Sequence, residues 1–121
     1  MIDALRNHCL AKKHVCESFP FDQHTLVFKV HNKIFALFSL EHDPLSISVK
    51  CQTEYAIELR ETFWQVSPGY HSNKKHWNTI ILDKFDKSLV CKWIDYSYEL
   101  VWDKLPKRLT ISTKSDCKEN A

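Results

Sequence analysis

Hydrophobic residues recur along the chain with two periods, one typical of helices and one typical of strands. At the N-terminus, Ile2, Leu5 and Cys9 fall at helical spacing, which predicts a first helix from Ile2 to about His14. Pro20 then interrupts the pattern, because proline lacks the backbone donor that a continuing helix or strand needs.

Three strand-like runs come next. Residues 25–30 are strong β-formers, residues 34–40 form a longer apolar run, and residues 45–50 alternate between apolar and polar. Asn32, between the first two runs, can adopt the positive φ of a tight hairpin. Together the runs predict an antiparallel meander in which residues 34–40 form a central strand and the third strand buries one face.

The second half of the chain returns to helical spacing. The pattern predicts a helix over residues 53–64, an irregular polar stretch over 65–75, a strand over 77–82 and a long helix over 86–104 that ends before Pro106. The residues expected to face the core from the long helix are Leu89, Trp93, Tyr96 and Leu100.

We therefore predict an α+β fold with the order helix, three-strand meander, helix, strand and long helix, in which the antiparallel sheet has about four strands. Residues 1–111 are expected to form a single domain, because their number suits one hydrophobic core. Residues 112–121 are polar and are expected to form a frayed tail.

Composition limits the classes of function. Hydrophobic residues make up 44% of the 121 residues and aromatic residues 12%, which argues for a packed core and against disorder. Gly69 is the only glycine, so a glycine-rich phosphate loop is excluded. The formal charge is only +2 and the pI is about 8.3. Dedicated nucleic-acid-binding domains typically have a pI above ~9. Nucleic-acid binding would therefore depend on local clusters of positive charge.

The cysteines and the N-terminal residues bear on the compartment. The five cysteines are odd in number, and no two are separated by two residues, unlike a secreted disulfide framework or a zinc ribbon. The first residues lack the apolar segment of a signal peptide, and no apolar run approaches the ~20 residues of a membrane span. These features predict a cytoplasmic protein with reduced thiols and no membrane association.

The most unusual segment lies between the second helix and the fourth strand. No carboxylate occurs from Thr62 to Leu82, whereas lysines and histidines are flanked there by aromatic rings. Cations attract phosphate groups, and an exposed ring can stack on a base. In the alternative interpretation, Pro68-Gly69-Tyr70 only shapes a turn, Trp77 belongs to the core and the lysines are merely solvated. The candidate nucleic-acid-binding residues of this segment are Tyr70, His71, Asn73, Lys74, Lys75, His76, Trp77 and Thr79.

A second basic patch follows the long helix. It contains Lys104, Lys107, Arg108 and Lys114, with no acidic residue from Lys104 to Ser115. Lys107 and Arg108 are therefore further candidates for phosphate contact. The alternative is that these cations only complement the negative end of the long helix.

The histidines and cysteines lack the spacing of a known metal site or catalytic motif. His71 and His76 are five residues apart with no carboxylate nearby, and residues 8–16 hold a looser group of two histidines and two cysteines. Cys51, after a strand, and Cys91, within a helix, are expected to be small buried hydrophobic residues. We therefore expect no metal, no cofactor and no enzymatic activity.

The segment from His71 to Thr79, followed by Leu82-Asp83, resembles the signature of the MmcQ/YjbR family of small bacterial proteins. The family pattern has a Pro-Gly-Tyr-His lead-in, then Asn-Lys, His-Trp, Ser/Thr and a closing Leu-Asp. The resemblance extends over about residues 2–110, because the hairpin, third strand and last helix follow in the expected order. It departs at turns, where His31-Asn32 stands in place of a frequent glycine and Lys84-Phe85-Asp86 in place of a Gly-Ser stretch.

The resemblance implies an α+β fold of the double-wing type, similar to the DNA-binding domain of a phage transcription factor, and members are commonly labelled DNA-binding on that analogy. The motif positions that it implies are Asn73, Lys74, His76, Trp77 and Thr79. Our leading hypothesis is a non-enzymatic, monomeric DNA-binding domain. One alternative is a protein-interaction module that uses Tyr70 and Trp77 as anchors. Another is a small-molecule or enzymatic role, with His76 as acid–base group and Lys74 as phosphate ligand.

Overall fold

The computed structural model describes residues 2–41, 44–69 and 76–110. Within these residues, the helices are α1 (Ile2–Leu10), α2 (Thr53–Thr62), α3 (Lys87–Asp103) and the single-turn α4 (Lys107–Thr110). The strands are β1 (Val15–Ser18), β2 (Thr25–Val30), β3 (Lys33–Ser39), β4 (Ser46–Lys50), β5 (Val66–Pro68) and β6 (Trp77–Ile81). They form one antiparallel sheet in the order β1-β2-β3-β4-β6-β5, so the predicted α+β class is confirmed.

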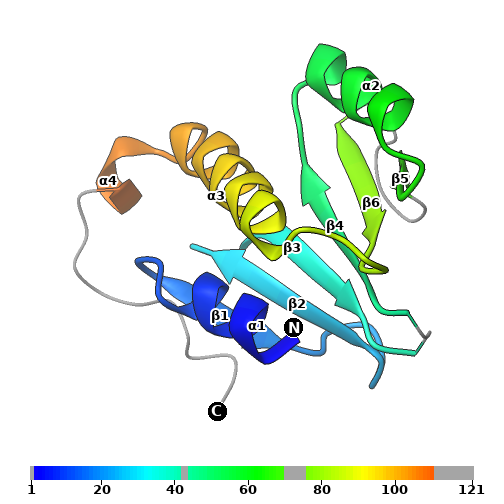
Figure 1. Cartoon of the computed structure of the whole chain (residues 1–121). Helices are drawn as coiled ribbons and strands as arrows, with labels where there is room; N and C mark the ends of the chain where they lie inside the picture. The colour runs from blue at the N-terminus through cyan, green and yellow to red at the C-terminus, as the bar shows by residue number, and fades with distance from the viewer. Residues whose placement is uncertain (1, 42–43, 70–75, 111–121) are drawn as a thin grey trace.

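The fold has two layers, a twisted sheet and a set of helices on one of its faces (Figure 1). The long helix α3 crosses β3 and β4 at the centre of the sheet, α1 lies beside it near β1, and α2 covers the β5–β6 end. The apolar side chains on this face join in one core that extends from α1 to α2. Burial of that continuous apolar surface is the main force that holds the layers together.

The central strands alternate between the two faces with the period of two expected for a sheet. Ile47 of β4 lies opposite Ile80 of β6, and both are fully buried beneath the helices. Ser48 lies opposite Thr79 on the other face, where both side chains are half-buried. The predicted alternation of residues 45–50 is therefore confirmed.

The β2–β3 hairpin turns through two residues with positive φ, His31 at 46° and Asn32 at 67°. Both values suit the tight turn that matches the twist of antiparallel strands, so the predicted role of Asn32 is confirmed. His31 is buried, with its ring 4.6 Å from that of His14 and 5.9 Å from that of Trp102, measured between centroids. Packing of this ring against His14 and Trp102 accounts for the burial of a histidine at the hairpin turn.

Two strands were missing from the predicted sheet. The first helix ends at Leu10, not near His14, and β1 follows it as an edge strand paired with β2. The stretch expected to be irregular after α2 contains β5, a three-residue edge strand paired with β6. Both are too short and too polar to show a clear period, and pairing with a neighbouring strand is what forms them. The sheet therefore has six strands within the described residues, not about four.

The buried face of α3 is rotated from the predicted one. Leu89 and Tyr96 pack only partly buried against the core, and Leu100 is half-exposed. Ser97, which the hydrophobic pattern excluded from the core, is fully buried because its hydroxyl is hydrogen-bonded to the backbone of two strands. The buried residues of the helix are Val90, Trp93, Ile94, Ser97 and Val101.

Helix α1 is anchored to α3 through Asp95. The carboxylate of Asp95 is hydrogen-bonded to Lys12 and lies 2.7 Å from Nε2 of His8. Burial opposes its ionisation, but the hydrogen bonds with Lys12 and His8 outweigh burial and hold the pKa of Asp95 below its usual value. The frayed tail predicted for residues 112–121 lies outside the described residues.

The cysteines differ in burial and in oxidation state. Cys9, Cys51 and Cys91 are free thiols, and Cys51 is buried as expected, whereas Cys91 is only half-buried. Cys16 is disulfide-bonded, so the expectation of reduced thiols is wrong for this residue. Burial raises the pKa of Cys9 to about 12 and that of Cys51 to about 11.

Candidate functional site

Only the second half of the predicted binding loop is described by the structure. Tyr70, His71, Asn73, Lys74 and Lys75 lie outside the described residues, so their predicted role stays a prediction. His76, Trp77 and Thr79 are described, and each is half-buried where the chain enters and forms β6. The backbone or side chains of these three residues form hydrogen bonds with neighbouring helices and strands.

Asn78, between the motif residues Trp77 and Thr79, holds α2 against the sheet. Its side chain is fully buried, accepts a hydrogen bond from Nε of Arg60 at 2.7 Å and donates to the Ala56 carbonyl at 3.2 Å. Arg60 also donates to the Trp77 carbonyl at 3.3 Å. This part of the family motif is therefore structural, because its polar atoms satisfy buried groups of the helix.

The other described motif residues combine structural contacts with partial exposure. The His76 carbonyl accepts a hydrogen bond from the Cys51 amide at 2.6 Å, and its Nδ1 lies 3.4 Å from the Thr53 hydroxyl. The hydroxyl of Thr79 is 2.8 Å from that of Ser48 on the face away from the helices. Trp77 lies opposite Lys50 in the β4–β6 register. Trp77 and Lys50, both half-buried, are thus cross-strand neighbours at this end of the sheet.

Gly69 is required by a close approach of two strands. Its amide donates to the Trp77 carbonyl at 2.8 Å, and an added Cβ would lie 2.7 Å from Cβ of Trp77. Gly69 does not adopt a positive φ, so space and not backbone freedom explains the glycine.

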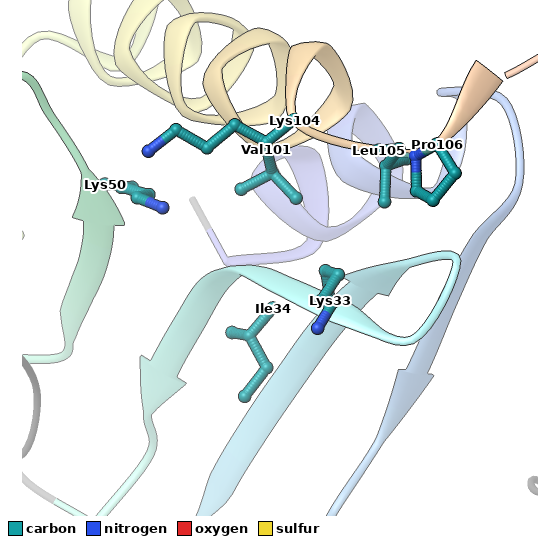
Figure 2. Close-up of a pocket in the computed structure, with 7 residues that line it drawn as sticks. All are labelled: Lys33, Ile34, Lys50, Val101, Lys104, Leu105 and Pro106. Atoms are coloured by element: carbon teal, nitrogen blue, oxygen red, sulfur yellow. The ribbon is translucent and has the colours of Figure 1, made fainter. Parts of the chain in front are cut away.

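A cavity between α3 and the sheet lies at the C-terminal end of α3. It has a volume of about 350 Å³. Figure 2 shows Lys104 extending from the end of α3 toward Lys50 of β4, with Lys33 across the cavity at the start of β3. The apolar lining residues are Ile34, Val101, Leu105 and Pro106. We call this the three-lysine cavity.

The three-lysine cavity exists because β3 and β4 separate there. Their pairing ends at Ala36 and Val49, one position before Phe35 and Lys50. At that next position the hydroxyl of Ser97 donates to the Phe35 carbonyl at 2.6 Å and accepts from the Lys50 amide at 2.8 Å. A side chain of α3 thus replaces the strand-to-strand contact and keeps both backbone groups satisfied.

The charged residues that line the cavity are all lysines. None of its described lining residues is acidic. Burial, and then repulsion by the charge of Lys104, lowers the pKa of Lys50 from its usual value. Lys107 and Arg108, the predicted candidates of the second basic patch, are exposed on α4 directly after the lining residue Pro106. The cavity and α4 are therefore adjacent, and we call them together the basic end, which also holds the exposed carboxylate of Asp103 beside Lys104.

Sequence patterns did not indicate Lys33 or Lys50 as site residues. They lie on separate strands, seventeen positions apart, and Lys104 is on a helix still further along the chain. No spacing rule joins three such positions, so only the packing of α3 on the open sheet brings them together. Lys104 alone was part of the predicted basic patch.

A second, shallower cavity of about 400 Å³ lies between α2 and α3. The indole N–H of Trp93 donates to the Tyr55 hydroxyl there at 3.1 Å, and the rings of Tyr55 and Tyr96 meet edge to face. These contacts show aromatic groups that stabilise the helix packing. The residues that line this cavity are Gln52, Tyr55, Lys92, Trp93 and Tyr96.

Metal and membrane features were sought in the described residues alone. There, no group of three or more histidine, cysteine or acidic side chains is arranged to hold a metal ion. Nor does any helix in those ranges combine the length and apolar character needed to span a bilayer.

Comparison with known proteins identifies relatives over most of the chain. The YjbR family model matches residues 10–100. The chain belongs to the YjbR family. It is 31% identical over 107 residues to the uncharacterized protein YjbR of Escherichia coli K12, which covers 88% of this chain and 91% of that protein. It is 33% identical over 91 residues to the uncharacterized protein YbdF of Escherichia coli O157:H7, covering 74% of this chain and 75% of that one.

Solved structures agree with this YjbR assignment. The crystal structure of DR2400 from Deinococcus radiodurans, which has a DUF419 domain, matches with a TM-score of 0.85 and 37% identity over 96% of this chain and 92% of that one. A protein from Pseudomonas syringae matches with a TM-score of 0.69 and 23% identity over 81% of this chain and 96% of that one, which supports the fold alone. The family resemblance drawn from the His71–Thr79 motif is thus confirmed.

Proposed function

We propose that this YjbR-family protein is a non-enzymatic DNA-binding domain whose contact surface is the basic end formed by the three-lysine cavity and α4. The observation that carries the proposal is the meeting of Lys33, Lys50 and Lys104 at one cavity whose described lining has no carboxylate. Lys107 and Arg108 extend the same charge onto an exposed turn.

Local charge is what such binding requires. The formal charge of the whole chain is only +2, so attraction to a phosphate backbone depends on where the cations gather. Each phosphate that a lysine or arginine neutralises releases counterions, which favours association at low salt. The half-buried ring of Trp77, opposite Lys50 in the sheet, adds an aromatic surface on which an unpaired base could stack.

The state of the thiols supports a binding role over a catalytic one. A nucleophilic cysteine needs a lowered pKa and access to substrate. Burial raises the pKa of Cys9 to about 12 and that of Cys51 to about 11, which is the opposite of activation. The alternative enzymatic role for His76 has Lys74 as its partner, which lies outside the described residues.

The test is a titration of fluorescently labelled duplex and single-stranded 20-mers at several salt concentrations. With three to five phosphate contacts, the slope of log K against log salt is expected to be roughly −2.7 to −4.5 for the duplex and roughly −2 to −3.5 for the single strand. The double variant Lys104→Glu/Arg108→Glu should weaken binding by at least about tenfold.

The matched control is Lys84→Glu/Lys87→Glu, which makes the same change of charge on exposed residues near the other end of α3. It should change affinity by less than about twofold, because Lys87 and Lys104 are about 25 Å apart along the helix. Absence of binding to every DNA at low salt would overturn the proposal. So would equal losses in the two double variants, which would show that only net charge matters.

A further inference from the structure

The three-lysine cavity has two chemically different parts. Lys33, Lys50 and Lys104 line one part, and Figure 2 shows Lys104 directed toward Lys50, whereas the side chain of Lys33 points away from these two. The remaining lining is apolar and includes Val101 and Leu105, which are buried in the core. A ligand that fits both parts carries a compact negative charge at one end and an apolar or ring-shaped group beside it.

The charges of the cavity favour an anion held within it over one that only touches its rim. Lys50 is half-buried, and the repulsion from Lys104 adds to the cost of its charge. The repulsion between the charges of Lys50 and Lys104 disfavours their joint ionisation, and a bound anion would relieve that repulsion. No acidic residue among the described lining performs this function in the protein itself.

We propose that the three-lysine cavity binds a terminal phosphate monoester and the sugar ring next to it. A monoester carries about −1.5 to −2 charges at pH 7 and presents three acceptor oxygens, which match several lysine donors better than the single charge of a bridging phosphodiester. The volume of about 350 Å³ lies within the ~300–1,000 Å³ of ligand sites and suits one nucleotide unit.

Two sources could supply this chemistry. One is the 5′-phosphorylated end of a DNA strand, in which case the inference rests on the proposed function and makes it end-specific. The other is a free nucleoside monophosphate, in which case the cavity is a small-molecule site. The two share the terminal phosphate monoester, so the experiment has an arm for each.

The experiment measures the affinity of the full chain for three probes. These are a single-stranded 8-mer with a 5′-phosphate, the same 8-mer with a 5′-hydroxyl, and adenosine 5′-monophosphate. We expect the phosphorylated 8-mer to bind at least about fivefold tighter than the hydroxyl form, and adenosine monophosphate to compete for the cavity. The ratio of the two 8-mer affinities is the readout, because it isolates the terminal phosphate from the rest of the strand.

Variants then connect this ratio to the cavity. Lys50→Met keeps most of the unbranched side chain but removes the charge, and it should reduce the ratio to about one. Lys87→Met, at the far end of α3, should leave the ratio unchanged. Thermal melting checks the fold, and the exposed Lys104→Met carries the same test if Lys50→Met is unstable.

The possible results separate this inference from the proposed function. If both 8-mers bind equally well, DNA binding stands and the terminal-phosphate site is overturned. If neither 8-mer binds but adenosine monophosphate does, and Lys50→Met abolishes that binding, the site stands and the DNA-binding function is overturned. A ratio above five that Lys50→Met and Lys104→Met leave unchanged would overturn the placement of the site in this cavity.

Discussion

The hydroxyl of Ser97 accepts a hydrogen bond from the backbone amide of Lys50 at 2.8 Å. The same hydroxyl donates to the Phe35 carbonyl at 2.6 Å, so one side chain of α3 connects the two strands where their own pairing has ended. Beyond this connection the strands separate, and Lys50 becomes a wall of the three-lysine cavity. The shape of the cavity therefore depends on a buried serine that is not itself one of the lining residues.

Replacing Ser97 by alanine should destabilise the fold by about 2–3 kcal/mol, because two buried backbone groups lose their hydrogen-bond partner. Urea denaturation followed by circular dichroism measures the change in unfolding free energy. Ser88→Ala, at an exposed position in the first turn of the same helix, should change it by less than about 0.5 kcal/mol. Equal effects of the two substitutions would show that the Ser97 bridge contributes little.

Asn78→Ala should cost about 2–3 kcal/mol of stability. The substitution removes the acceptor of the Arg60 Nε and the donor to the Ala56 carbonyl, both of which hold α2 on the sheet. Thr79→Val, the next residue in the same motif, loses only a half-buried contact with Ser48 and should cost less than about 1 kcal/mol. Thermal or urea unfolding measures both variants. A larger loss of unfolding free energy for Thr79→Val than for Asn78→Ala would contradict this prediction.

Gly69→Ala should destabilise the protein by about 1–3 kcal/mol, because the added methyl group would lie 2.7 Å from Cβ of Trp77 and the two strands would have to move apart. Ser67→Ala, at an exposed position of β5, serves as the control and should have an effect below about 0.5 kcal/mol. An unfolding midpoint for Gly69→Ala that matches the unsubstituted protein would contradict the close approach described above.

The buried thiols should make stability fall at alkaline pH. Burial raises the folded-state pKa of Cys9 to about 12 and of Cys51 to about 11, from the ordinary thiol value of 9.0. Between those values and 9.0 the unfolded chain loses these protons while the folded chain keeps them, so the unfolding free energy decreases as pH rises. Relative to pH 7, the loss at pH 10 is expected to be about 1.4 kcal/mol for each thiol.

Two measurements check this prediction. Urea unfolding at pH 8, 9 and 10 should show a shallower pH dependence for Cys9→Ala than for the unsubstituted protein. Labelling with iodoacetamide at pH 8, followed by peptide mass spectrometry, should leave Cys9 and Cys51 unmodified until urea is added. Rapid labelling of either thiol in the native protein would contradict its burial.

Much of the local structure could be predicted from neighbouring residues. Strand β2 has the predicted bounds, and β4 and β6 differ from prediction by one residue at one end. The long helix begins after Asp86, whose side chain accepts from the Ser88 amide at 2.9 Å as an N-cap. These features depend on interactions between residues close in the chain, so their signals are local.

Features that depend on a distant partner were not predictable. Edge strands β1 and β5 form because β2 and β6 offer them backbone partners. Ser97 is buried because α3 happens to cross the sheet where two strands separate, which no periodicity of the helix reveals.

By itself, the sequence determined the α+β class, the order of the main elements, membership of the YjbR family and a chain of weak net charge with local basic clusters. The tertiary structure alone decided that Asn78 braces a helix and that Lys33, Lys50 and Lys104 share one cavity. The physical reason is distance along the chain. Propensities and periodicity act between near neighbours, whereas a binding surface is made where packing brings remote side chains together.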